Sequence, residues 1–190
     1  ENCRVLQINN PVLTSRDLMK IEGLHMPGLQ AKKVSLLYYK NASLALALDR
    51  LFVACDKAYY AGANILILSD RGVDENHIAI PSLLAVSAVQ QYLVRTKKRT
   101  AISLILESAE PRDVHHFATL FGYGASAVNP YLAQDCIGEL VAEGALNKDY
   151  YAAVDAYDQA ILDGVMRIAS KMGISSICLL YTSPSPRDRG

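Results

Sequence analysis

Hydrophobic and polar positions along this chain fall into blocks that predict strands followed by helices. An unbroken apolar run at residues 65–68 is typical of a strand buried on both faces, and the polar loop 69–74 follows it directly. Residues 34–39 and 101–106 also read as strands, and 125–128 is a fourth, shorter one.

Apolar residues at helical spacing predict a helix after each of these strands. Residues 44–59 carry the clearest stripe, and Gly62 stands just past it, where a left-handed cap is expected. Further helices are predicted from Pro81, over 111–121 and over 131–141. A strand followed by a helix, repeated four times, implies right-handed crossovers and a mostly parallel sheet. The fold class is therefore α/β with four β-α units, either half-barrel-like or a small doubly wound sheet.

The pattern divides residues 1–175 into three parts, which a tail at 176–190 follows. Residues 1–30, with a short helix at 16–22, lead into a central α/β domain at 31–147. A long helical stripe at 148–175 predicts a bridging helix into a following domain.

The two ends of the chain are also informative. The sequence starts at Glu1, without a signal segment, so we expect it to be a piece of something longer. Residues 176–190 contain two Pro and two Arg without periodicity, resemble a translated sequencing adaptor, and are expected to be a non-native tail.

The composition of the chain bears on which kinds of binding partner it favours. The chain has 190 residues, of which 51% are hydrophobic, and a formal net charge of +0, with a pI of about 7.1. Such a balance favours neither nucleic acid nor a membrane surface as partner, and no apolar run is long enough to span a bilayer. The four cysteines form no C-x-x-C pair, which predicts buried, inert thiols in a reducing compartment.

The loop after the central strand is the best candidate site, because the loops after parallel strands open onto one face. Here Asp70 is a candidate base or hydrogen-bond acceptor, and Arg71 is a candidate anion clamp beside Ser69. The alternative is that Asp70 and Arg71 pair with each other and cap the next element. Glu107 ends the next strand and either faces the same mouth or belongs to a solvated helix start.

Other polar residues carry weaker signals. Adjacent residues His115 and His116 point in different directions on a helix and do not share one metal easily, so a surface or interface role is expected. The Gly-rich stretch 122–125 follows a helix and predicts a helix stop, not a phosphate cradle. Asn129 stands at the end of the fourth strand. No nucleophile–base or metal-ligand spacing is visible in the sequence.

Longer stretches resemble a known family. The chain is similar to the central domain of the glutamate synthase large (alpha) subunit, running into the start of its FMN-binding synthase domain. The similar segments are residues 61–74, 80–86, 107–117, 122–125, 127–133 and 170–175. Two features depart from the family pattern: Gln90 and Gln91 stand where histidines are usual, and the similarity ends at about Ile177.

The resemblance implies a parent enzyme that makes glutamate from glutamine and 2-oxoglutarate by amide-nitrogen transfer and reduction. It implies FMN and an iron–sulfur cluster in that parent and no cofactor in this region. The implied partners are the flanking glutaminase and synthase domains, with an electron-donor protein or small subunit. The implied location is the cytoplasm or the plastid stroma.

No catalytic, cofactor-binding or metal-binding residue of the family falls in this stretch, and Cys3 is not the glutaminase nucleophile. The expected role is interdomain and tunnel-forming. Its candidate residues are Ser69, Asp70, Arg71, Glu107, His115, His116 and Asn129. The alternative from another class is a regulatory module that binds a small anion or metabolite.

Overall fold

We analysed a computed structural model of the chain, which describes residues 8–174. The predicted tail at 176–190, Cys3 and Cys178 lie outside this range. In chain order the elements are α1 (Ser15–Glu22), β1 (His25–Met26), β2 (Leu29–Ser35), β3 (Leu37–Tyr39), α2 (Leu44–Tyr60), β4 (Ile65–Ser69), β5 (His77–Ala79), α3 (Ser82–Arg95), a 3-10 turn (Arg99–Ala101), β6 (Ser103–Glu107), α4 (Val114–Gly122), β7 (Ala127–Asn129), α5 (Tyr131–Ala142) and α6 (Tyr150–Lys171).

The main sheet has five strands in the order β1-β2-β4-β6-β7. All neighbours are parallel except the short β1, which pairs antiparallel with the start of β2. Residues 11–13 run beside β7, where the Val128 N–H donates to Pro11 O and the Leu13 N–H donates to Val128 O, both at 2.8 Å. The leading segment is therefore part of the sheet.

The stretch predicted as one strand at 34–39 is two strands that belong to different sheets. The chain leaves the main sheet at Leu36, whose N–H donates to Ser69 O at 2.8 Å and whose carbonyl accepts from the Ile80 N–H at 2.9 Å. Beyond Leu36, β3 pairs antiparallel with β5 in a second, two-stranded sheet. Periodicity does not show this break, because Leu36 is apolar and fully buried.

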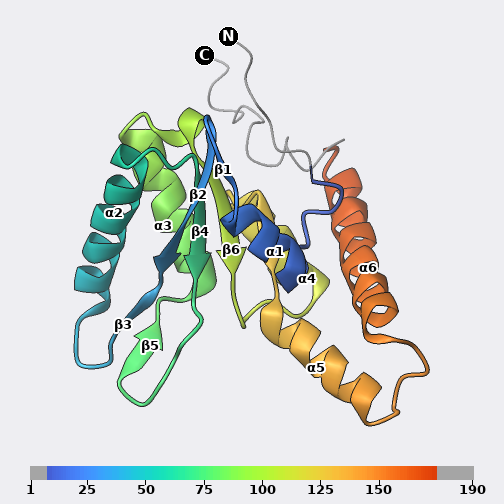
Figure 1. Ribbon diagram of the computed structural model, residues 1–190. Coiled ribbons are helices and arrows are strands. Elements are labelled where there is room, and N and C mark those ends of the chain that lie inside the picture. Colours follow the sequence, from blue (N-terminus) through green and yellow to red (C-terminus); the bar gives the residue numbers. More distant parts are fainter. Residues whose placement is uncertain (1–7, 175–190) are drawn as a thin grey trace.

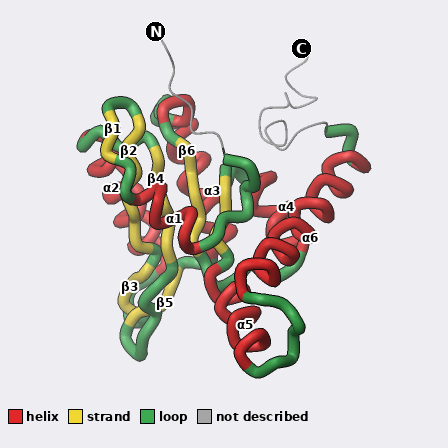
Figure 2. Tube along the Cα trace, turned by 45° about the vertical axis from the view of Figure 1, so that its right-hand side comes forward, coloured by secondary structure: helices red, strands yellow, loops and turns green. Residues whose placement is uncertain are grey.

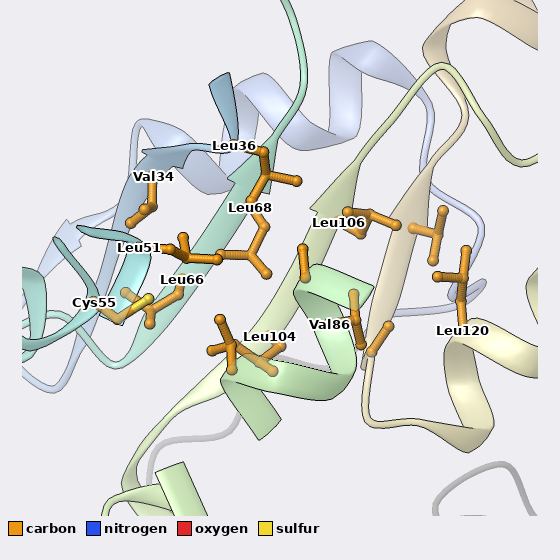
Figure 3. Packing of buried hydrophobic residues seen from close by; sticks show 14 of the residues in the cluster. Val34, Leu36, Leu51, Cys55, Leu66, Leu68, Val86, Leu104, Leu106 and Leu120 are labelled. Atoms are coloured by element: carbon orange, nitrogen blue, oxygen red, sulfur yellow. The ribbon is translucent and has the colours of Figure 1, made fainter. Parts of the chain in front are cut away.

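The strand order settles the choice between the two predicted windings. The parallel strands lie in chain order, so right-handed crossovers place α2, α3 and α4 on the same face of the sheet. The large core confirms this placement, since it joins Leu51 of α2, Val86 of α3 and Leu120 of α4 to alternate residues of the strands (Figure 3). A doubly wound sheet would carry helices on both faces, so the winding is that of half a barrel.

The opposite face of the sheet is covered by α1. Leu18 and Ile21 of this helix pack with Leu13 and with the other alternate set of strand residues, among them Ile67 and Ile105. In Figure 1, α1 lies in front of the sheet, whereas α3 passes behind it. Thr14 caps the start of α1 and forms a capping box with Asp17.

The last two helices depart from a simple repeat of four units. Only Gln134 of α5 is buried, whereas α6 supplies Ile161 and Val165 to the large core. Gly164 allows this close packing, because a Cβ atom built there would lie 2.5 Å from Cγ2 of Val114 in α4. The predicted bridging helix is thus docked against α4 along its middle.

Several local predictions need correction. The helix predicted from Pro111 begins at Val114, with Asp113 as its cap. Cys55 is buried as predicted, but Cys136 is exposed on α5. Within residues 8–174, no helix is long and apolar enough to cross a membrane.

Candidate functional site

The candidate site is a row of polar residues at the carboxyl ends of the parallel strands. Strand register places Ser35, Ser69, Glu107 and Asn129 side by side as the last residues of β2, β4, β6 and β7. Lys33 lies two residues before Ser35, on the same face of the sheet. Of the two positions left open for Glu107 by the sequence, its contacts with Ser69 and Arg71 show the one at the mouth beside the Asp70 loop.

Glu107 is the centre of the first half of the site. Its carboxylate accepts from the Ser69 hydroxyl at 2.6 Å and from Nε of Arg71 at 2.9 Å, and Nζ of Lys33 lies 3.1 Å away. Nζ of Lys33 also lies 2.5 Å from Glu22 of α1. The buried carboxylate thus ties three strands and the covering helix together.

These contacts decide the charge state of the carboxylate. Burial by itself raises the pKa of Glu107, but donation from Ser69, Arg71 and Lys33 outweighs it, so the pKa is lowered. Burial by itself lowers the pKa of Lys33, but the carboxylates of Glu22 and Glu107 outweigh this effect, so the pKa of Lys33 is raised. Glu107 is therefore held as an anion, and Lys33 as a cation.

Asp70 is the centre of the second half. It accepts from the Ser108 hydroxyl at 2.5 Å, from the Ala109 N–H at 3.1 Å and from the Tyr131 hydroxyl at 2.7 Å. The Arg71 guanidinium carbon lies 3.9 Å from the centroid of the Tyr131 ring. Arg71 therefore bridges the two halves, with Glu107 on one side and Tyr131 on the other.

We name these residues, Lys33, Ser69, Asp70, Arg71, Glu107, Ser108 and Tyr131, the strand-end cluster. Each of its two carboxylates accepts from three donors of the same domain, which hold the carboxylates in place. The predicted alternative, a local Asp70–Arg71 pair, is wrong, because each residue uses partners from β6 or α5. The geometry is that of a rigid polar face, with the Arg71 side chain 42% exposed.

Asn129 ends its strand in the same row but its side chain turns elsewhere. Its Nδ2 donates to Leu13 O at 2.9 Å and to Oε1 of Gln134 at 3.2 Å. Nε2 of Gln134 donates to Leu13 O at 3.0 Å and lies 3.2 Å from Asp158 of α6. Burial, together with Asp155 and Asp17, raises the pKa of Asp158 to about 7, although the Gln134 bond lowers it. This second polar group joins β7, α5 and α6.

The two histidines lie outside the strand-end cluster. Both are exposed near the start of α4, where their N–H groups are capped by Asp113. Nδ1 of His116 accepts from the Arg112 N–H at 3.1 Å. Within residues 8–174, no group of three or more metal-ligating side chains comes together.

Sequence reasoning missed Lys33, Ser108 and Tyr131 as members of the cluster. Lys33 reads as an exposed residue of an edge strand, and only the sheet shows that it reaches Glu107. Asp158 gave a readable signal, because it interrupts the apolar stripe between Val154 and Ile161. A charged residue in the middle of such a stripe indicates a buried polar contact.

The fold and site define an α/β domain with half-barrel winding and a hydrogen-bonded polar face at its strand ends. The family described as the glutamate synthase central domain matches residues 1–181, and the chain belongs to that family.

Three curated relatives illustrate the similarity. The chain is 41% identical over 176 residues to the large chain of glutamate synthase (NADPH) of Bacillus subtilis, covering 93% of this chain and 11% of the relative. It is 38% identical over 191 residues to the ferredoxin-dependent glutamate synthase 2 of Synechocystis, covering 92% and 12%. It is 34% identical over 182 residues to the glutamate synthase (NADH) of Schizosaccharomyces pombe, covering 92% and 9%. The chain thus spans about a tenth of the length of these relatives.

The cysteines within residues 8–174 do not fit the iron–sulfur cluster implied for such an enzyme. An iron–sulfur cluster needs several thiolates together, whereas Cys55 is buried in α2, where burial raises its pKa to about 12, and Cys136 is exposed on α5.

Proposed function

We propose that this chain is the central, interdomain part of a glutamate synthase, and that its strand-end cluster forms part of the wall along which ammonia passes between two active sites. The parent enzyme makes glutamate from glutamine and 2-oxoglutarate, with FMN and an iron–sulfur cluster held by other domains. The flanking glutaminase and synthase domains of the same polypeptide are its partners. The proposed location is the cytoplasm or the plastid stroma, which the chloroplastic forms among the relatives support.

Family membership carries this proposal, and the geometry of the cluster supports it. Ammonia that escapes into solvent is protonated and diluted, so transfer between two sites needs a rigid wall without groups that trap it. The strand-end cluster has this character, because the carboxylates of Glu107 and Asp70 are occupied by donors within the domain. Arg71 and Lys33 have side chains that are 42% and 41% exposed, so both can contact a neighbouring domain.

The regulatory anion-binding module is not favoured. Both cations of the cluster, Lys33 and Arg71, already contact the carboxylate of Glu107 at 3.1 and 2.9 Å. An added anion would have to compete with a buried carboxylate whose lowered pKa keeps it charged. The relatives are glutamate synthases, which favours the first role.

The proposal is tested by measuring how tightly the two half-reactions are coupled in the full-length synthase that contains this domain. Arg71→Ala removes the exposed cation and its stacking on Tyr131, so we expect severalfold more free ammonia per glutamine hydrolysed. Arg167→Ala, which removes an exposed cation from α6, is the matched control and should leave the ratio unchanged. Wild-type ratios in a folded Arg71→Ala enzyme would contradict a role for this face in transfer.

A further inference from the structure

The free edge of the main sheet lies along β2. This strand pairs with β4 over residues 31–35, but with β1 only at Leu29 and Gln30. In the part of the chain that the structure describes, nothing pairs with the other edge of 31–35. The Leu36 N–H donates to Ser69 of the neighbouring strand, so, by alternation, the N–H groups of Ala31, Lys33 and Ser35 face outward.

A groove runs beside this edge, between β2 and α2, with a volume of about 580 Å³. Its floor is apolar and includes Val34 of β2, Leu51 and Ala58 of α2, and Ile80. Figures 1 and 2 show α2 at the end of the row of elements, beside β2.

The apolar surface continues onto the outer face of α2. Leu46, Val53 and Tyr60 follow one another at seven-residue spacing and are 43%, 53% and 76% exposed. Residues at this spacing lie on one side of a helix, where the exposed cations Arg50 and Lys57 alternate with them.

Three cations border the groove. Lys32, Arg50 and Lys57 line it, are exposed, and make no ion pair within residues 8–174. They differ from Lys33, whose ammonium contacts Glu22 and Glu107 on the opposite face of the sheet. Since the whole chain has a formal net charge of +0, this is a local positive surface that selects an acidic occupant.

The same cations argue against a second copy of the chain as the occupant. Edge-to-edge pairing of two β2 strands would bring two sets of Lys32, Arg50 and Lys57 together. Lysines on an edge strand are a common protection against such pairing. The same three cations that repel a second copy of the chain attract an acidic strand of another sequence.

We propose that an extended, acidic segment from another part of the longer polypeptide adds to β2 as a further strand and lies in the β2–α2 groove. This inference rests on the proposed function, in which the chain is one domain of a larger protein. Backbone bonds to Ala31, Lys33 and Ser35 supply the pairing. Alternate side chains of the added strand face α2, where apolar ones meet the floor and carboxylates meet Arg50 and Lys57. Five residues of edge give a short contact, which suffices within one polypeptide because the local concentration is high.

Hydrogen exchange in the full-length protein, resolved at single amides, tests this pairing. Lys32 and Val34 face β4 and serve as the internal reference for an intact sheet. We expect the outward amides of Ala31, Lys33 and Ser35 to exchange within about tenfold of that reference. Outward amides that exchange a hundredfold faster than the reference, or protection that rises with protein concentration, would overturn the proposal.

A charge-reversal pair identifies the chemistry of the occupant. Arg50→Glu with Lys57→Glu should speed exchange of the outward amides at least tenfold and leave Lys32 and Val34 protected. Lys148→Glu with Arg167→Glu makes the same charge change at exposed positions away from the groove and should not. Unchanged protection in the first pair would exclude an acidic strand. The proposed function is judged separately, by ammonia release.

Discussion

The guanidinium of Arg71 lies against the ring of Tyr131, 3.9 Å from its centroid, and this contact joins the two halves of the strand-end cluster. Arg71 also donates to Glu107 at the end of β6, and the Tyr131 hydroxyl donates to Asp70. One side chain from the loop after β4 and one from the start of α5 thus connect the ends of three strands. This connection gives the polar face its rigidity.

The ring and the hydroxyl of Tyr131 are expected to contribute separately. Tyr131→Phe keeps the ring under Arg71 but removes the bond to Asp70, and should cost about 1 kcal/mol of unfolding free energy. Tyr131→Leu also loses the stacking and should cost about 1 kcal/mol more. Urea unfolding measures both values. Equal costs for the two variants would show that the stacking contributes nothing.

The charge of Glu107 should stabilise the fold at neutral pH. Its pKa is lowered on folding, so its contribution is present above its ordinary value of 4.5 and is lost as pH falls through the folded pKa. Glu107→Gln should therefore cost about 1–2 kcal/mol at pH 7, a modest value because Lys33 and Arg71 are 41% and 42% exposed. The cost should shrink in acid. Glu143→Gln, at an exposed site, is the control, and a cost independent of pH would refute the electrostatic explanation.

Asp158 should have the opposite effect. Its pKa is raised on folding from 3.8 to about 7, so the folded state binds the proton more tightly, and stability falls as pH rises from about 4 to about 7. Asp158→Asn keeps an acceptor for Gln134 without the charge, and should gain about 2–4 kcal/mol at pH 8 and nothing below pH 4. Asp155→Asn, at an exposed neighbour, should gain far less. Thermal unfolding across pH 4–8 would detect the difference, and a gain that does not change with pH would rule out this cause.

The packing of α6 on α4 depends on the missing side chain of Gly164. A Cβ atom there would lie 2.5 and 2.8 Å from the two Cγ atoms of Val114, so Gly164→Ala should cost about 2 kcal/mol through overpacking. Adding Val114→Ala should recover part of that loss by making room. Gly122→Ala meets nothing within 4 Å and should be neutral or slightly stabilising. A neutral Gly164→Ala would mean that α6 is not held tightly against α4.

Local periodicity predicted the order of the main strands and helices because each buries one face or stripe against a core. It missed β1 and β5, which have two and three residues, too few to show a period. It also joined β2 to β3, since Leu36 continues the apolar pattern across the point where the chain changes sheets. The gathering of Ser69, Asp70, Arg71 and Glu107 was predictable because parallel strands end at one edge.

By itself, the sequence determined the α/β class, the family and the edge of the sheet where polar residues collect. Only the tertiary structure decided between half-barrel and doubly wound sheets, because winding depends on the spatial order of strands, which no local pattern contains. It also decided the partners of the charged groups: Lys33 reaches Glu107 across the sheet, and Gln134 reaches Asp158 between two helices. Such pairs join residues far apart in the chain, and local spacing does not show which of them meet.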